Sequence, residues 1–224
     1  MEAQTKTAII LGATGLTGGV LLRILLEDDR YGKIKLFSRS SVGITHWKIE
    51  EHLGNLMQLE QFEIDFTAED VFCCIGTTKS KTPDKETYRN IDYGIPVTAA
   101  KLASKNGIIS FLAISSMGAN SKSSVFYNRL KGEMEERVLK EKSKNTYLLR
   151  PSLISGNREE KRAGEWIFKQ VMKGVNLVLV GPLQKYRSIA PETIAKAMVV
   201  VANGGYESHI IESDKISKIA TLSD

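Results

Sequence analysis

Tyr127 and Lys131 are four positions apart in a stretch whose continuation, residues 131–138, is typical of a helix. Side chains at positions i and i+4 share one helix face, so we expect the phenol and the ammonium to converge on one point. A tyrosine phenol has a reference pKa of about 10, and a nearby cation favours its ionised form. The pair therefore has the composition of a proton donor and acceptor that works near neutral pH.

Two serines stand shortly before this pair. Ser115 and Ser116 directly follow residues 108–114, an apolar run that predicts a buried strand. A hydroxyl at the end of that strand could hydrogen-bond a carbonyl oxygen and orient it, while Lys131 could hold a ribose. Because a lone Y-x-x-x-K spacing is common by chance on helices, this interpretation depends on the rest of the chain.

A glycine-rich turn near the N-terminus predicts a dinucleotide site. Residues 8–11 read as a strand buried on both faces, and an apolar segment of helical length, residues 16–26, begins at once. Between them, Gly12 permits a tight turn, Gly15 lets backbone approach a pyrophosphate, and Gly18 lets helix pack close to strand. Backbone N–H groups and the dipole at the helix start favour a phosphate pair. The alternative is a glycine-rich turn without a ligand.

The end of the next predicted strand, residues 33–37, bears on which nicotinamide dinucleotide is bound. An NAD site usually places Asp or Glu roughly 20 residues beyond the glycine turn. Here Ser38 and Arg39 follow the strand, and their hydroxyl and guanidinium donors suit a 2′-phosphate. We therefore expect NADP rather than NAD. The alternative is that Arg39 is an ordinary surface arginine.

Strand-like and helical segments alternate along the chain. Further strands are expected within residues 46–56, 70–75, 146–149 and 177–180, with helices over residues 82–104, from Trp166, and over residues 191–202. In the helix over residues 82–104, Thr82 is the expected N-cap, Pro83 the first helical residue, and Pro96 a kink or break. The alternation predicts an α/β fold with a doubly wound, mostly parallel sheet. We expect one domain over residues 1–224, with residues 152–224 forming the substrate side.

Composition excludes several other classes of protein. Hydrophobic residues make up 42% and charged residues 25% of the chain, as in globular proteins, and the net charge of +5 is scattered rather than gathered into a nucleic-acid stripe. The only cysteines, Cys73 and Cys74, are adjacent, and no metal-ligand spacing occurs. No apolar run approaches the roughly 18 residues of a membrane span. We expect a cytoplasmic protein.

Five motifs together resemble the atypical short-chain dehydrogenases/reductases, in the branch of Tat-interacting-protein-like oxidoreductases. They are Gly12-Ala13-Thr14-Gly15-Leu16-Thr17-Gly18, Phe72-Cys73-Cys74-Ile75-Gly76-Thr77-Thr78, Ser115-Ser116-Met117-Gly118-Ala119-Asn120, Phe126-Tyr127-Asn128-Arg129-Leu130-Lys131-Gly132-Glu133 and Leu149-Arg150-Pro151-Ser152-Leu153. They follow the family's order and span residues 5 to 200.

The resemblance implies an NADP-binding Rossmann fold with Tyr127 and Lys131 as the proton-transfer pair. It implies that Ser115 or Ser116 orients the carbonyl, and we favour Ser116. The implied cofactor-binding residues are Gly12, Thr14, Gly15, Leu16, Thr17, Gly18, Ser38, Arg39, Asn55, Leu56, Gly76, Thr77, Thr78, Lys131 and Pro151. Asn55 replaces an aspartate that relatives commonly place near the adenine, and Asn90 matches an asparagine of extended enzymes only loosely.

The expected activity is NADP-dependent hydride transfer between the nicotinamide and a small-molecule carbonyl or alcohol. An alternative is an NADP(H)-binding regulator that acts through a protein partner with little or no turnover. A third possibility is a nucleotide-sugar epimerase or dehydratase, for which residues 151–224 would form a cramped substrate domain.

Overall fold

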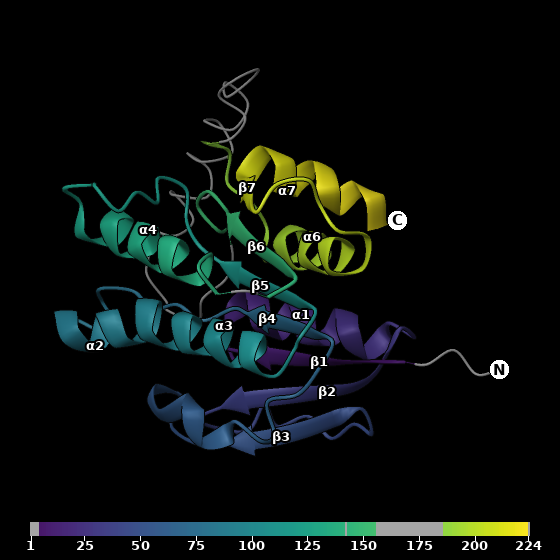
Figure 1. Ribbon diagram of the computed structural model, residues 1–224. Coiled ribbons are helices and arrows are strands. Elements are labelled where there is room, and N and C mark those ends of the chain that lie inside the picture. Colours follow the sequence, from purple (N-terminus) through teal and green to yellow (C-terminus); the bar gives the residue numbers. More distant parts are fainter. Residues whose placement is uncertain (1–4, 142, 156–185, 224) are drawn as a thin grey trace, which may run out of the picture.

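A single parallel sheet organises the computed structural model, which describes residues 5–141, 143–155 and 186–223. Within these residues seven strands pair in the order β3-β2-β1-β4-β5-β6-β7 (Figure 1). They are β1 (Lys6–Leu11), β2 (Tyr31–Ser38), β3 (Ile49–Leu53), β4 (Asp70–Cys73), β5 (Ser110–Ile114), β6 (Asn145–Arg150) and β7 (Ile210–Glu212). The predicted α/β class is confirmed, and every strand pair among them is parallel.

Helices cover both faces of the sheet (Figure 1). On one face lie α1 (Leu16–Glu27), α6 (Pro191–Gly204) and α7 (Ser213–Ala220); on the other lie the short 3-10 helix η1 (Leu56–Phe62), α3 (Ile95–Lys105) and α4 (Phe126–Val138). Successive residues of β1 point to opposite faces, so Ala8 and Ile10 join the first core, whereas Ile9 and Leu11 join the second. A strand buried on both faces is therefore apolar without alternation.

The helix expected over residues 82–104 is divided. It consists of α2 (Lys85–Arg89), a π-helical turn η2 (Asn90–Gly94) and α3. The expected N-cap is wrong: Asp84 caps α2 by accepting the Thr87 N–H at 2.7 Å, while Thr82 Oγ1 lies 2.8 Å from Thr77 Oγ1. Pro96 has no N–H to donate to a carbonyl one turn back, which accounts for an irregular turn just before it.

The C-terminal elements extend the sheet beyond the sequence prediction. The three-residue strand β7 pairs with β6, and α7 follows it directly. A strand this short carries too little periodicity to be predicted. The strand expected at residues 177–180 and the helix expected from Trp166 lie outside the described residues. Across the described parts of the chain, none of the helices combines the length and apolarity needed to cross a bilayer.

The glycine turn joins β1 to α1 by close backbone contact. Gly12 has φ of +89°, a conformation that L side chains rarely adopt, and a Cβ there would lie 2.9 Å from the Cys74 carbonyl oxygen. A Cβ on Gly18 would lie 2.1 Å from the Gly12 carbonyl oxygen. The first and third glycines therefore fix the start of α1 against the end of β1.

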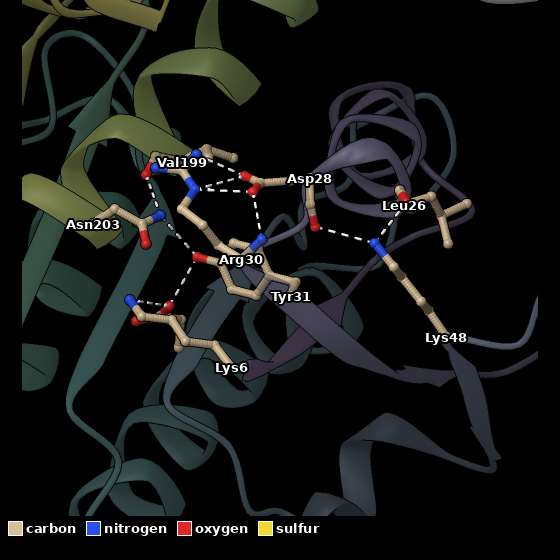
Figure 2. Close-up of polar contacts among 9 residues, drawn as sticks. Lys6, Leu26, Asp28, Arg30, Tyr31, Lys48, Val199 and Asn203 are labelled. Carbon is tan, nitrogen blue, oxygen red and sulfur yellow. Dashed lines mark hydrogen bonds and ion pairs between the residues drawn. The ribbon is translucent and has the colours of Figure 1, made fainter. Parts of the chain in front are cut away.

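Polar contacts join the amino ends of β1, β2 and β4, away from the glycine turn (Figure 2). The buried Asp70 carboxylate accepts from Lys6 Nζ at 3.1 Å and from the Tyr31 hydroxyl at 2.8 Å, and Asn203 donates to Tyr31 at 3.0 Å. Burial and the Asp70 charge raise the pKa of Tyr31, so its proton is retained. Nearby, Lys48 Nζ donates to the carbonyls of Leu26 and Asp28 at 2.8 and 3.1 Å. Lys48 thus supplies the cation that the last turn of α1 lacks.

The Gly18→Ala substitution should destabilise the protein. Helix propensity alone would favour alanine by about 1 kcal/mol. The clash with the Gly12 carbonyl should outweigh that gain, with a net loss of roughly 1–3 kcal/mol in the free energy of unfolding, measured by urea denaturation. Gly204→Ala is the matched control, because a Cβ there meets nothing within 4 Å. Equal stability of the two variants would contradict this account of the turn.

The Lys48→Met substitution should lower the free energy of unfolding by about 1–3 kcal/mol, because it leaves two carbonyls at the end of α1 without their donor. Lys33→Met is the control, since Lys33 pairs with Glu50 at an exposed site and such pairs contribute less than about 1 kcal/mol. The two variants are compared by urea denaturation. A loss no larger for Lys48→Met than for Lys33→Met would refute the capping role.

Candidate functional site

A cavity of about 1180 Å³ opens at the carboxyl ends of the central strands. Its walls come from the segments that follow β1, β2, β4, β5 and β6, together with α1, α4, the π-helical turn η2 and the start of α6. The chain reverses its direction of winding between β1 and β4, and parallel α/β sheets bind ligands in the crevice at such a point. This cavity is therefore the candidate functional site.

The glycine turn forms one wall of the cavity. Thr14, Gly15, Leu16 and Thr17 line it, whereas Gly12 and Gly18 lie behind the wall and set its backbone. The N-cap of α1 is Gly15, which provides no side-chain cap, and the first turn carries no acidic residue. Backbone N–H groups at the start of α1 are thus available to an anion in the cavity.

Tyr127 and Lys131, both on α4, line the same cavity. Tyr127 is 37% exposed, while Lys131 is buried. The helix that carries them is held close to its preceding loop, because a Cβ on Gly132 would lie 2.1 Å from the Ser121 nitrogen. Tyr88, on α2, packs edge-on against Tyr127 with ring centroids 6.4 Å apart. The predicted pair and the glycine turn thus face one space.

Lys131 has an anionic partner that the sequence analysis missed. Its Nζ lies 2.9 Å from Asp92 Oδ1 and 3.4 Å from the Ile114 carbonyl oxygen. Asp92 is 1% exposed and lines the cavity from the π-helical turn η2. Burial alone would lower the pKa of Lys131, but the Asp92 charge and the neighbouring Tyr127 outweigh it and raise this pKa. Lys131 is therefore an ammonium in the folded protein near neutral pH.

Asp92 could not be found by motif spacing. Sequence reasoning singled out Asn90, which is exposed at the start of η2. The π-helical turn changes which residues of this segment face inward, and the only local hint of it is Pro96 shortly afterwards.

The two serines have different surroundings. Ser115 lines the cavity, but its hydroxyl donates to Glu135 Oε1 at 2.5 Å. Ser116, the serine favoured by sequence, does not line the cavity, and its buried hydroxyl has no hydrogen-bond partner among the described residues. The structure thus brings Ser115, rather than Ser116, to the cavity wall.

Glu135 is held from its other side by Arg150. The Arg150 guanidinium donates from Nε to Oε1 at 2.9 Å and from Nη2 to Oε2 at 2.5 Å, and its Nη1 reaches Glu212 at 3.0 Å. These charge-assisted hydrogen bonds raise the pKa of Arg150. Glu135 therefore stays close to Ser115 as a fixed hydrogen-bond acceptor.

The residues expected to bind a 2′-phosphate do not line the cavity themselves. Ser38 is buried and donates to the Ser40 carbonyl at 2.7 Å, and neither Ser38 nor Arg39 lines the cavity. The wall beside the end of β2 is instead formed by Ser40, Ser41 and, from α1, Arg23. Among the described residues, no hydrogen bond or ion pair engages the exposed Arg23 guanidinium. Arg23 follows Gly19 by four positions, so helical spacing could have indicated it.

The turn after β4 borders the cavity as expected, with Gly76, Thr77 and Thr78 in the wall. The Thr77 N–H is already donated to Asp92 Oδ2 at 2.8 Å, and its carbonyl accepts from Tyr88 at 3.2 Å. Cys74 also lines the cavity, and desolvation raises the pKa of its thiol, so the thiol is protonated near neutral pH.

Three further expected contacts do not line the cavity. Asn55 caps η1 by accepting the Met57 N–H at 3.0 Å, and Leu56 is part of the core behind it. Pro151 is buried, and its carbonyl accepts the Met117 N–H at 3.0 Å. In this structure these residues support the fold rather than the cavity wall.

The described residues fit a dinucleotide. The cavity exceeds the roughly 300–1000 Å³ of common ligand pockets, and the uncapped start of α1 offers donors to a pyrophosphate. Lys131, paired with Asp92, stands at the other side of the space and offers an ammonium.

Comparison with known proteins identifies relatives but no matching family model. The chain is 28% identical over 229 residues to Protein HTATIP2 of Rattus norvegicus, covering 100% of this chain and 93% of that protein. It is 33% identical over 164 residues to Protein FMP52-1, mitochondrial, of Scheffersomyces stipitis, covering 70% of each. The fold resembles the Bordetella bronchiseptica enzyme WbmG in complex with NAD, with a TM-score of 0.71, 14% identity, and coverage of 99% of this chain and 78% of that one.

The FMP52 name corrects one expectation. These relatives are mitochondrial proteins by name, which contradicts the cytoplasmic location expected from composition. An ordinary composition without a long apolar run is compatible with either compartment.

The chain is 33% identical to FMP52-1 over 70% of both chains, which indicates a family relationship and not only a shared fold. The match to HTATIP2 extends over the whole chain and thus includes all five sequence motifs. The chain belongs to the atypical short-chain dehydrogenase/reductase family.

Proposed function

We propose that this protein is an NADP-dependent oxidoreductase that interconverts a carbonyl and an alcohol. The observation that carries the proposal is that Tyr127 and Lys131 line the same cavity as the glycine turn. One end of this space offers backbone donors for phosphates, and the other offers a phenol beside an ammonium.

The chain's own residues divide the work of binding and proton transfer. The backbone of Thr14 to Thr17 would hold the pyrophosphate, and the Lys131 ammonium would hold the ribose next to the nicotinamide. The bound nicotinamide would supply or accept the hydride. Tyr127 then donates its hydroxyl proton to the carbonyl oxygen in reduction and accepts it back in oxidation.

The hydrogen bonds of Ser115 limit its role. Because its proton is donated to Glu135, its oxygen offers lone pairs to the cavity rather than a donor. It would therefore accept a hydrogen bond from an alcohol or amide group of a bound molecule. On this geometry Tyr127, not Ser115, donates to a substrate carbonyl.

The choice of NADP is supported by the wall beside the end of β2. A 2′-phosphate there would meet the Arg23 guanidinium and the hydroxyls of Ser40 and Ser41, a donor set suited to phosphate.

Tyr127→Phe should abolish turnover while leaving cofactor affinity intact, because only the proton donor is lost. We expect a fall in kcat of about 10²-fold or more, measured as NADPH oxidation with a panel of aldehydes and ketones. Tyr206→Phe, outside the cavity, is the control. Turnover by Tyr127→Phe equal to wild type on any accepted substrate would refute the role, and tight NADPH binding without turnover across the panel would favour the regulatory alternative.

Arg23→Ala should reduce the preference for NADPH over NADH by about tenfold or more, the effect of losing a charge-assisted hydrogen bond. The affinities of both cofactors are measured by fluorescence titration. Arg39→Ala is the matched control, since Arg39 is exposed and outside the cavity wall, and should leave the preference unchanged. If Arg39→Ala alone reduced the preference, the assignment to Arg23 would be wrong.

A further inference from the structure

Asp92 connects two parts of the cavity that come from distant segments of the chain. Its Oδ1 lies 2.9 Å from Lys131 Nζ on α4, and its Oδ2 accepts the Thr77 N–H at 2.8 Å from the turn after β4. Lys131 and Asp92 are 3% and 1% exposed, and all three residues line the cavity. One carboxylate therefore fixes both a side chain and a backbone segment of the site.

The position of Asp92 is irregular in a way that a purely structural residue does not require. It stands in the π-helical turn η2 between α2 and α3. Such turns occur frequently at functional sites, because the extra residue changes which side chains face inward.

The charge of Asp92 matters as well as its position. A lone buried ammonium is costly, and it loses its proton more readily than an exposed one. Besides Asp92, the titratable groups that influence Lys131 are Tyr127 on its own helix and the Cys73 thiol on β4; Tyr88 packs against Tyr127. Of these four side chains, Asp92 is the only carboxylic acid.

We propose that Asp92 is a positioning residue that keeps Lys131 charged, directs its ammonium toward the cofactor ribose, and holds the Thr77 turn against the same cofactor. This inference rests on the proposed function. In this role Asp92 needs one oxygen for Lys131, the other for the Thr77 N–H, and its negative charge to keep Lys131 protonated.

Asp92→Asn tests the proposal because asparagine has one oxygen where aspartate has two and carries no charge, so it serves only one of the two donors. The titration of Lys131 is followed by the ¹³Cε resonance of labelled lysine, assigned by its absence in Lys131→Met. With burial unchanged and the carboxylate charge lost, the pKa of Lys131 should fall below that in the wild type. NADPH affinity, measured by fluorescence, should fall about tenfold or more.

Asp70→Asn is the matched control. Asp70 is equally buried and pairs with Lys6 at 3.1 Å, but it lies at the amino ends of the strands, away from the cavity. It should lose stability without changing the Lys131 titration or NADPH affinity. An unchanged Lys131 titration in Asp92→Asn, or unchanged NADPH affinity, would overturn the proposal.

Two further results are informative. If Asp92→Asn does not fold, Asp92→Leu combined with Lys131→Met removes both charges; recovery of folding would support the pairing, and failure would overturn it. A wild-type protein that binds no nicotinamide cofactor would refute the proposed function, while the Lys131 titration would still decide whether Asp92 sets its charge.

Discussion

The site depends on the close approach of α1 to the end of β1. Gly18 lies so near the Gly12 carbonyl that no side chain fits between them, and the helix therefore begins directly at the carboxyl edge of the sheet. This contact directs the uncapped N–H groups of α1 into the cavity. The remaining walls come from neighbouring strands that end at the same edge because all the pairs are parallel.

Buried charged side chains have different surroundings at the amino and carboxyl ends of the strands. At the amino ends, the Asp70 carboxylate of β4 accepts hydrogen bonds from Lys6 of β1 and Tyr31 of β2, and both contacts hold these strands together (Figure 2). At the carboxyl ends of the strands, the Asp92–Lys131 pair lines a cavity. The first pair joins strands, whereas the second lies where we propose that a cofactor binds.

A similar distinction separates the two serines. The Ser115 hydroxyl donates a hydrogen bond to Glu135, which Arg150 holds in place, and this fixes the direction of the hydroxyl. Ser116, one position later, does not line the cavity, and its buried hydroxyl has no hydrogen-bond partner among the described residues. The chemistry available in the cavity is therefore decided by which groups already have partners, not by residue type alone.

Local pattern determined much of this protein. The apolar runs, the glycine spacing and the i, i+4 relation of Tyr127 and Lys131 predicted the α/β class and the elements that carry the glycine turn and the pair, because strand and helix periods are local properties. Tertiary structure decided the rest. It decided that Asp92 pairs with Lys131, that Arg23 rather than Arg39 lines the cavity, and that Asn55 caps a helix. These outcomes depend on a π-helical turn and on contacts between residues far apart in the chain, which local spacing does not encode.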